Sequence, residues 1–511
     1  MKKLSTLLSF LVLSLFSQAQ LSPIWSLNCG GNNMDILENC CYGKENKYTF
    51  VGNTRSTNHD ITTNHGGVDA WIYIKNADGS TFYSKTLDGT FDDYVTDVVQ
   101  NSDTLYTFLI NSNSFGTTDF PNYNGSSDIW LKTLGSDTLL STGINIGGFD
   151  ADYGYDLLLP PDEGYIVAGK SSSTNGIYSE NHGGEDGFVV RYSNTGTLSW
   201  GHCFGSAADE GLFKMALTPN GNIFAFGQTK VSGNYNPWLL KLSSTGNQLD
   251  ERIIQGDSNT YPLALVAIND NLLFAGGFTN STEMEFDANN DNHAGYIVRF
   301  DGNTDYDTIV FISGNSMEML TDIIRYGDTL LLATIVSISN AGIFTGNHGS
   351  SDVFVAIYDL DLNIKGIYPF GGTGMDGVYE FCLSSSFLTP SNEMVVATCS
   401  ESTNGHVPAN YGMVDGWIFK FNPELLISGI SDDAEENISI YPNPAKETLN
   451  VLLPEISTCS IKLCGINGKI LKEWQNCGNI NRLDIGDIPG GIYLLQINNE
   501  KNTITRKIII P

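Results

Sequence analysis

A short segment led by a large aromatic residue recurs seven times along the chain. Successive aromatic residues are separated by 59, 58, 50, 58, 58 and 63 positions. The seven segments are Asp69-Ala70-Trp71, Asp128-Ile129-Trp130, Asp186-Gly187-Phe188, Asn236-Pro237-Trp238, Ala294-Gly295-Tyr296, Asp352-Val353-Phe354 and Asp415-Gly416-Trp417. A fixed period of this kind indicates a repeat protein, in which each unit buries its apolar face against the next unit.

Each repeat has the pattern of β-strands. Short apolar runs such as Tyr48–Gly52 and Tyr165–Gly169 are bounded by turn residues such as Ala77-Asp78-Gly79. No stretch of ten or more residues keeps a 3.6-residue apolar period, so helices are not expected. About 58 residues hold four strands with their loops, which suits one propeller blade better than a short β-solenoid rung. We therefore predict an all-β fold, a seven-bladed β-propeller, with six or eight blades as alternatives.

The repeat boundary is permuted, which predicts how the ring closes. After six of the aromatic segments the chain enters a strand that ends in Gly, as in Thr81–Gly89. The segment at Trp417 instead runs into Asn422-Pro423, and the missing strand matches Ile24–Gly31 near the N-terminus. Pairing both ends of the repeat region in one sheet removes two exposed edges. We expect a closed ring over residues 21–425.

The N-terminus has the pattern of an export signal. Met1-Lys2-Lys3 is basic, Leu7–Phe16 is apolar, and Ser17-Gln18-Ala19 places small residues at a cleavage site. Residues 1–19 are therefore predicted to be a signal peptide directing export to the periplasm. No later run approaches the ~20 apolar residues of a spanning helix, so no transmembrane segment is expected in the mature chain.

A second module is expected after the repeats. Residues 426–436 are acidic and lack core-forming periodicity, so they are interpreted as a linker. From residue 437 to 511, eight Lys and Arg face six Asp and Glu, and seven short alternating runs follow one another. This pattern favours a small antiparallel β-sandwich.

Three ordered motifs in residues 437–511 resemble the C-terminal sorting domain (type A) of type IX secretion cargo. They lie in Tyr441–Val451, Leu483–Leu495 and Lys507–Pro511. The residues that carry the resemblance are Tyr441, Pro442, Asn443, Pro444, Gly490, Gly491, Tyr493 and Lys507. The resemblance implies an Ig-like sandwich that the outer-membrane translocon recognises and that is commonly removed after crossing. It also implies a cargo that is secreted or attached to the cell surface.

Charge and cysteine content exclude several classes of function. The chain has 26 Lys and Arg against 57 Asp and Glu, a formal net charge of −31. A chain this acidic is a poor partner for nucleic acid or for an anionic lipid surface. The nine cysteines form no CxxC pair, which removes support for zinc-ribbon and thioredoxin sites. Buried free thiols are the favoured explanation for most of them.

No catalytic motif is present, and the candidate metal ligands are sparse. The sequence lacks HExxH, GxSxG, P-loop and dinucleotide fingerprints. Asp287, Asn289 and Asp291 alternate like the start of a calcium loop, but the expected sixth-position Gly is missing and Val298 replaces the bidentate Glu. A Ca²⁺ site there is the only cofactor hypothesis.

Polar and aromatic residues copied with the repeat have two interpretations. His65, His182, His293 and His348 each precede an aromatic segment, and most of these segments begin with Asp. A ring of such residues could ligate metals, glycans or cations, but a turn residue copied in every repeat is favoured. Loop residues Tyr123, Tyr178 and Tyr235 could stack on sugars, although packing within the loops is the favoured role.

Two functions fit these observations. The first is an exported, non-enzymatic binding or adhesion module with an extracellular glycan or protein ligand. The alternative is a secreted hydrolase or lyase acting on polysaccharide or peptide at a propeller face. Glycosidase chemistry needs two carboxylates about 5–9.5 Å apart, and no repeat is singled out for catalysis. The binding function is therefore preferred.

Overall fold

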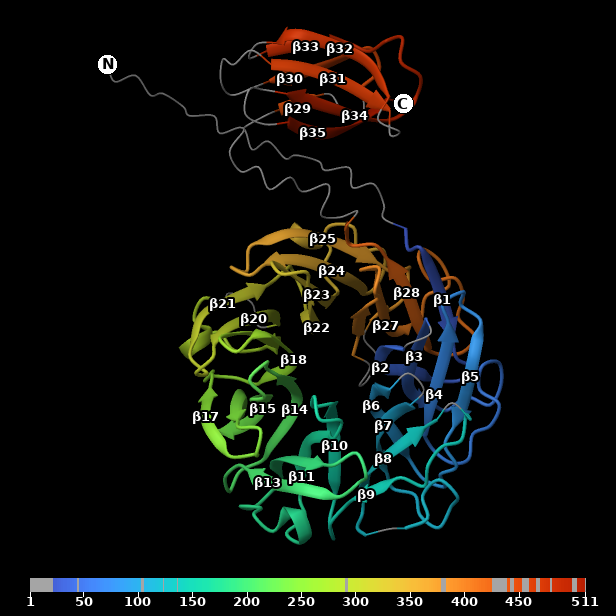
Figure 1. The fold of residues 1–511 in the computed structure, drawn as a ribbon, viewed down its shortest axis with the longest axis vertical. Helices are drawn as coiled ribbons and strands as arrows, with labels where there is room; N and C mark the ends of the chain where they lie inside the picture. The colour runs from blue at the N-terminus through green and yellow to red at the C-terminus, as the bar shows by residue number, and fades with distance from the viewer. Residues whose placement is uncertain are drawn as a thin grey trace, which may run out of the picture. The chain divides into compact units, whose positions relative to one another are not determined.

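The chain divides into two compact units, Met1–Pro423 and Glu424–Pro511. The computed structural model describes residues 22–510 except 44–45, 103–104, 123, 136, 290–292, 378–382, 425–438, 442–444, 453–458, 466–468, 478–479 and 499–502. The expected signal peptide (1–19) and linker (426–436) therefore lie outside the described residues. The two units are considered separately below (Figure 1).

The described part of the first unit forms seven four-stranded antiparallel sheets, which we call blades 1 to 7. Blade 1 contains β2 (Asp35–Gly43), β3 (Lys47–Thr54), β4 (Asp69–Asn76) and β5 (Thr81–Thr86). Blade 2 contains β6 (Asp93–Ser102), β7 (Leu105–Ser112), β8 (Asp128–Leu134) and β9 (Ile144–Ile146). Blade 3 contains β10 (Asp152–Leu158), β11 (Tyr165–Ser171), β12 (Asp186–Tyr192) and β13 (Leu198–Phe204). Each sheet follows chain order, so the repeat in the sequence becomes a repeat in space.

The remaining blades follow the same plan. Blade 4 contains β14 (Glu210–Leu217), β15 (Ile223–Val231), β16 (Asn234–Leu242) and β17 (Gln248–Ile253). Blade 5 contains β18 (Thr260–Asn269), β19 (Leu272–Thr279), β20 (Ala294–Asp301) and β21 (Tyr306–Ile312). Blade 6 contains β22 (Glu318–Tyr326), β23 (Leu330–Ser337), β24 (Asp352–Asp359) and β25 (Ile364–Phe370). Three short 3-10 turns, η1 (Gly176–Tyr178), η2 (Met284–Phe286) and η3 (Gly342–Phe344), each bury one aromatic side chain.

Blade 7 joins the two ends of the repeat region, as the permuted boundary predicted. Its strands are β26 (Ser385–Leu388), β27 (Met394–Ser400), β28 (Asp415–Phe421) and β1 (Trp25–Cys29), in the order β1-β28-β27-β26. Strand β1 is antiparallel to β28 and sets Trp25 opposite Lys420. The innermost strands also contact one another around the ring, and β26 meets both β22 and β2 (Figure 1). The predicted all-β, propeller-type fold is confirmed.

The recurring aromatic residues form the core between blades. All seven, Trp71, Trp130, Phe188, Trp238, Tyr296, Phe354 and Trp417, are buried. Trp130, for example, packs in one cluster with Ile72 and Val51 of the preceding blade. Burying an aromatic side chain of this size removes a large apolar area from water. The sequence period is therefore the period of interblade packing.

Polar side chains link neighbouring blades near the ring centre. Asn39 Nδ2 donates a hydrogen bond to Asp97 Oδ1 at 2.7 Å, and the Leu157 N–H donates to Asp97 Oδ2 at 2.6 Å. One blade further, the Met215 N–H donates to Asp156 Oδ2 at 2.7 Å. Because these residues follow β-bulges in the innermost strands, the bulge turns each side chain toward the next blade.

The second unit is a two-sheet sandwich. One sheet contains β29 (Ser439–Tyr441), β30 (Thr448–Leu452) and β33 (Ile480–Asp484). The other contains β31 (Cys459–Gly465), β32 (Ile470–Cys477), β34 (Gly491–Asn498) and β35 (Thr503–Ile510), in the order β32-β31-β34-β35. Alternate apolar residues of both sheets, among them Leu449, Leu463, Leu495 and Ile508, form one core. The predicted small β-sandwich is confirmed.

Candidate ligand-binding pocket

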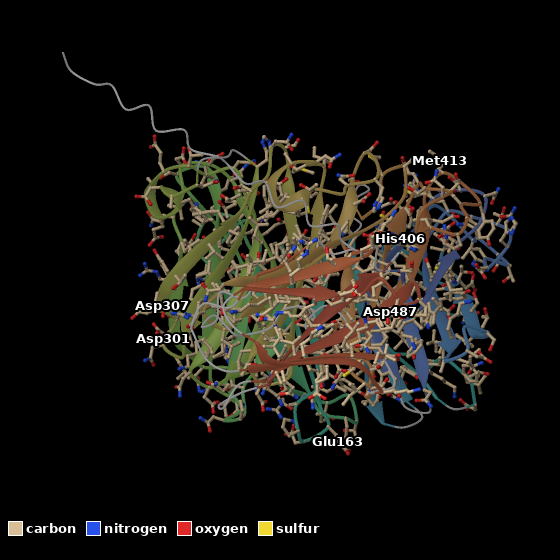
Figure 2. All side chains as sticks on the ribbon, turned by 90° about the horizontal axis from the view of Figure 1, so that it is seen from above. Glu163, Asp301, Asp307, His406, Met413 and Asp487 are labelled. Atoms are coloured by element: carbon tan, nitrogen blue, oxygen red, sulfur yellow. The ribbon has the colours of Figure 1, made fainter. Side chains whose placement is uncertain are left out.

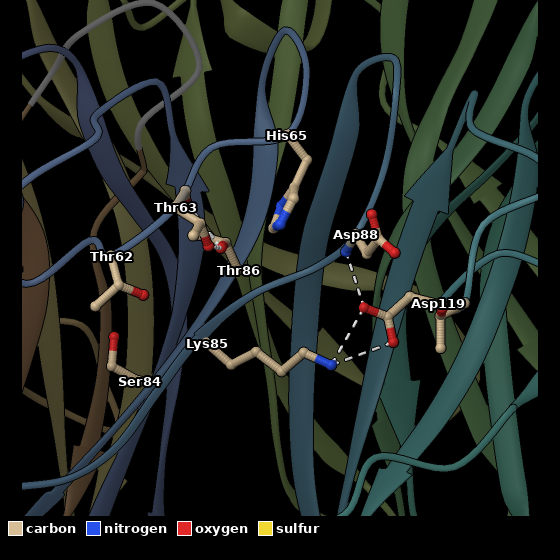
Figure 3. A pocket seen from close by; sticks show the side chains of 9 residues that line it. Thr62, Thr63, His65, Ser84, Lys85, Thr86, Asp88 and Asp119 are labelled. Carbon is tan, nitrogen blue, oxygen red and sulfur yellow. Dashed lines mark hydrogen bonds and ion pairs between the residues drawn. The ribbon is translucent and has the colours of Figure 1, made fainter.

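A polar pocket lies where blade 1 meets blade 2. Its cavity volume is about 410 Å³. The lining comes from three separate segments: Thr62, Thr63 and His65 of the β3–β4 loop, Ser84, Lys85, Thr86 and Asp88 on or just after β5, and Thr118 and Asp119 of the β7–β8 loop (Figure 3). Five of these nine residues carry hydroxyl groups, so the pocket is suited to a ligand rich in hydrogen-bonding groups.

An ion pair joins the two sides of the pocket. Lys85 Nζ lies 3.2 Å from each carboxylate oxygen of Asp119, and the Asp88 N–H donates to Asp119 Oδ2 at 2.8 Å (Figure 3). The Asp119 side chain is 8% exposed and the Lys85 side chain is 35% exposed. The carboxylate of Asp119 is therefore neutralised by a cation and a backbone donor, which fits a positioning role rather than proton transfer.

A second cation lies behind the same carboxylate. Lys132 is fully buried and donates to the backbone oxygens of Ser141 and Thr142 at 3.2 and 3.0 Å. Burial lowers the pKa of the Lys132 ammonium to about 8, and the charge of Asp119 opposes that shift. Its Nζ also lies 5.6 Å from the ring centre of Phe120, so buried groups form the wall behind the pocket.

Several groups in the pocket remain available to a ligand. The hydroxyl oxygens of Thr63 and Thr86 lie 3.0 Å apart and share a hydrogen bond. Thr62 and Thr118 are exposed, and their hydroxyls bond to no residue in the part of the chain that the structure describes. The Asp88 carboxylate likewise has no bonded partner there. A donor or acceptor entering the pocket thus meets two hydroxyls and one carboxylate.

The repeated histidines and aspartates form a common turn. The Asp at the start of a third strand accepts the backbone N–H of the residue four positions earlier, as in His65 to Asp69 at 2.7 Å and Tyr411 to Asp415 at 2.5 Å. Where that residue is His, its Nδ1 also approaches the carboxylate, at 2.6 Å for His182 and Asp186. The four histidines precede the third strands of blades 1, 3, 5 and 6, so they are spread around the ring and the turn interpretation describes them.

A second acidic position recurs at the start of the first strand in most blades. Asp35, Asp93, Asp152 and Asp376 begin or precede a first strand. Each accepts a hydrogen bond from a serine hydroxyl two residues after the second strand, such as Ser56 to Asp35 at 2.7 Å. A Cβ atom on Gly30 would lie 2.7 Å from Asp35 Oδ2 and 2.9 Å from Asp415 Oδ1. Only glycine fits between two carboxylates from neighbouring blades.

These interblade carboxylates are buried and resist ionisation. Burial raises the pKa of Asp93 and Asp415 to about 7, and that of Asp152 and Asp352 to about 6. Neighbouring carboxylates add to this shift, Asp35 acting on Asp415 and Asp376 on Asp352. At the start of the third strand, one carboxylate oxygen in each of five blades is buried without a hydrogen-bond partner among the described residues. These oxygens belong to Asp69, Asp128, Asp186, Asp352 and Asp415.

The calcium hypothesis concerns residues with different roles. Asp287 is exposed just after η2, whereas Asn289 is buried and donates through Nδ2 to the Ser281 carbonyl at 2.8 Å. Asn181 and Asn347 make the same kind of bond in their repeats, at 3.0 and 3.1 Å. Asp291 lies outside the described residues. Among the residues that the structure describes, no three His, Cys, Asp or Glu side chains form a group that could hold a metal ion, and the calcium site stays a prediction.

The sorting-motif residues occupy the sandwich. Tyr441 ends β29, Gly490 and Gly491 lie at the start of β34, and Lys507 is on β35 opposite Leu494. The Tyr493 hydroxyl donates to the Pro489 carbonyl at 2.6 Å, which fixes the turn before β34. Pro442, Asn443 and Pro444 lie outside the described residues.

The C-terminal unit matches a known family. Residues 439–511 match the family model of the secretion system C-terminal sorting domain. The chain carries the sorting domain of type IX secretion cargo. This domain indicates handling by the type IX secretion machinery and export to the cell surface or secretion from the cell. In the described part of the cargo, no helix has the length and apolar character needed to cross a membrane.

Similarity of the cargo to solved structures is remote. A fungal alcohol oxidase of the AA5 family in complex with copper has 11% identity and a TM-score of 0.42, with 96% of this chain and 99% of that chain covered. The polysaccharide lyase Uly1 has 8% identity and a TM-score of 0.44, with 75% and 89% covered. PorZ, a surface component of the type IX secretion system of Porphyromonas gingivalis, has 11% identity and a TM-score of 0.24, with 93% and 81% covered. These scores are too low to transfer any activity or ligand, and no curated protein matches the cargo.

Sequence reasoning did not find the pocket. Its lining residues come from three segments between Thr62 and Asp119, and of these only His65 belongs to a pattern that recurs along the chain. One usable signal is that the β7–β8 loop has no His at the turn position, where Asn124 stands, although three other repeats carry His there.

Proposed function

We propose that this cargo is an extracellular glycan-binding module that uses the pocket between blades 1 and 2. The observation that carries the proposal is a cavity of about 410 Å³ lined by five hydroxyl residues, one lysine and two aspartates. Sugars present many hydroxyls that both donate and accept hydrogen bonds, and such a lining can match them. The binding module reaches the outside because the outer-membrane translocon recognises residues 437–511.

The engaged state of Asp119 favours binding over hydrolysis. A general acid needs a proton that it can release to the substrate, whereas Asp119 is held by Lys85 and by the Asp88 N–H. Asp88 alone then remains as an available carboxylate of the lining. A hydrolase or lyase acting at this pocket would reveal itself by product formation in the binding assays below.

Removing one available hydroxyl should weaken binding without disturbing the fold. Thr118→Val keeps the side-chain shape and deletes a group that has no partner in the described structure. A net hydrogen bond contributes about 0.5–1.5 kcal/mol, so we expect affinity for the best sugar of a glycan array to fall roughly threefold to tenfold. Isothermal titration calorimetry on the full mature chain measures this.

A matched threonine in another blade serves as the control. Thr282→Val changes a similar hydroxyl in the β19–β20 loop, far along the ring from the pocket. Its affinity should equal that of the unmodified chain. Equal affinities for all three proteins would contradict the assignment of the pocket as the binding site.

Truncation should separate export across the outer membrane from folding. A chain ending at Pro423 keeps all seven sheets of the first unit and is expected to accumulate in the periplasm rather than outside the cell. Cell fractionation with immunoblotting measures the distribution. Conversely, a periplasmic reporter fused to residues 437–511 should appear outside. Surface delivery of the truncated chain would show that the sorting domain is dispensable.

A further inference from the structure

The loops that line the pocket carry two exposed phenylalanines, whose rings stack on each other. Phe91 is 51% exposed and Phe115 is 49% exposed. Their ring centres lie 5.9 Å apart with an interplanar angle of 22°. Burying such side chains is normally favourable, so an exposed stacked pair beside a polar cavity calls for a functional explanation.

The loops that carry the pair are fixed to one another. The Phe91 N–H donates to Ser114 Oγ at 2.9 Å, and the Asn113 N–H donates to the Asp92 carbonyl at 3.1 Å. Together with the bond from the Asp88 N–H to Asp119, these contacts hold the β5–β6 and β7–β8 loops as one unit. The stacked rings are therefore presented on a preformed support, which lowers the entropic cost of binding.

The pair is close to the pocket along both loops. Phe91 follows Asp88 by three residues, and Phe115 precedes Thr118 by three residues. Three extended residues span at most about 10–11 Å, which is about the length of two linked pyranose rings. The β7–β8 loop joins the second and third strands of its blade, as the Met413 loop between β27 and β28 does, so it lies on the same face of the ring. The β5–β6 loop is bonded to it and lies on that face too. Figure 2 shows Met413 and Glu163 on opposite faces.

Charge narrows the chemistry of the ligand. The pocket contributes one lysine and two aspartates, and Lys85 is already paired with Asp119. The chain as a whole has a formal net charge of −31. A carboxylated or sulfated polysaccharide would be repelled by this field, whereas an uncharged sugar would not.

We propose that the pocket and the Phe91–Phe115 pair form two adjoining subsites for a neutral oligosaccharide. One sugar residue bonds to the hydroxyls and to Asp88 in the pocket, and the apolar face of the next sugar stacks on the phenylalanines. This inference rests on the proposed function and adds to it the ligand class and its minimum length.

The test compares chain lengths and ring variants on the full mature chain. Titration calorimetry measures affinity for the monosaccharides glucose and mannose and for three neutral series: cellobiose to cellotetraose, mannobiose to mannotetraose, and maltose to maltotetraose. In one series, affinity should rise at least about tenfold from one sugar residue to three. Phe91→Ala and Phe115→Ala should each abolish most of that gain and leave monosaccharide affinity unchanged. Phe149→Ala, which removes a phenylalanine that is 74% exposed at the next blade junction, should behave like the unmodified chain. Circular dichroism verifies that each variant is folded.

The outcomes separate the two proposals. Saccharide binding that depends on Thr118 but not on chain length, or that survives both Phe variants, overturns the second subsite and leaves the proposed function intact. Tighter binding of oligogalacturonate than of any neutral series overturns the neutral ligand class. Absence of binding to every sugar of the panel overturns both proposals.

Discussion

A chain that starts at Gly30, and so lacks strand β1, is expected to lose on the order of 5 kcal/mol of unfolding free energy. Without β1, the outer edge of β28 is exposed over the stretch from Gly416 to Lys420. Trp417, which is fully buried, also loses the hydrogen bond from its Nε1 to Ser26 Oγ at 2.8 Å. Urea denaturation followed by tryptophan fluorescence measures the loss, and size-exclusion chromatography detects association through the open edge.

The matched control removes only the residues before that strand. A chain starting at Ile24 retains β1 and should unfold at the urea concentration of the unmodified protein. A synthetic peptide covering residues 22–30 should restore part of the stability of the shortened chain by pairing with β28. Unchanged stability of the chain starting at Gly30 would show that the ring closes without its N-terminal strand.

The first unit is expected to be more stable at pH 5 than at pH 8. The pKa values of Asp93, Asp152, Asp352 and Asp415 are raised to about 6–7 by burial, against about 3.9 in an unfolded chain. The folded state therefore binds more protons between pH 4 and 7, and stability rises as pH falls through that window. Allowing for partial screening, we expect the free energy of unfolding to be roughly 3 kcal/mol higher at pH 5 than at pH 8. The melting temperature should rise by several degrees over the same interval. Differential scanning calorimetry from pH 4 to 8 measures the profile.

A single neutral substitution should flatten this dependence. Asn236 occupies in blade 4 the position that Asp415 occupies in blade 7, each opposite the end of the second strand, so the fold already accepts Asn there. Asp415→Asn keeps an acceptor for the Tyr411 N–H and removes a buried charge next to Asp35. It should stabilise the protein at pH 8 by about 1–2 kcal/mol and have little effect at pH 5.

An exposed carboxylate controls for the overall charge of the chain. Asp150→Asn changes the net charge by the same amount at a solvent-exposed position. Its pH profile should follow that of the unmodified protein. If Asp150→Asn and Asp415→Asn raised stability at pH 8 equally, long-range repulsion rather than the interblade carboxylates would account for the effect.

The strand pattern and the repeat could be read from the residues because they depend on local chemistry. Trp71, Trp130 and Trp417 recur at one period and are buried in the same place of each blade. Ile24–Gly31 was recognised as the missing strand because its composition matches the other fourth strands, and β1 pairs with β28 as expected. Apolar alternation likewise located the strands of the C-terminal sandwich.

The aromatic residues of the loops were harder to interpret. Of the tyrosines that sequence reasoning considered for sugar stacking, Tyr178 is fully buried and donates its hydroxyl to the Ile146 carbonyl at 3.1 Å. Phe91 and Phe115 belong to no pattern in the sequence, yet they are half exposed and stacked. Exposure in a loop depends on which neighbouring segments cover it, and a local pattern does not contain that information.

The sequence by itself determined the repeat, the closing strand and the sorting domain, because period, alternation and short motifs are properties of neighbouring residues. The tertiary structure alone decided the pocket and the interblade carboxylates. Lys85 and Asp119 are 34 residues apart and meet only because blade 2 packs against blade 1. Asp35 and Asp415 lie at opposite ends of the repeat region and converge on Gly30 only when the ring closes. Charges brought together over such distances acquire their properties from burial and proximity, which exist only in the folded chain.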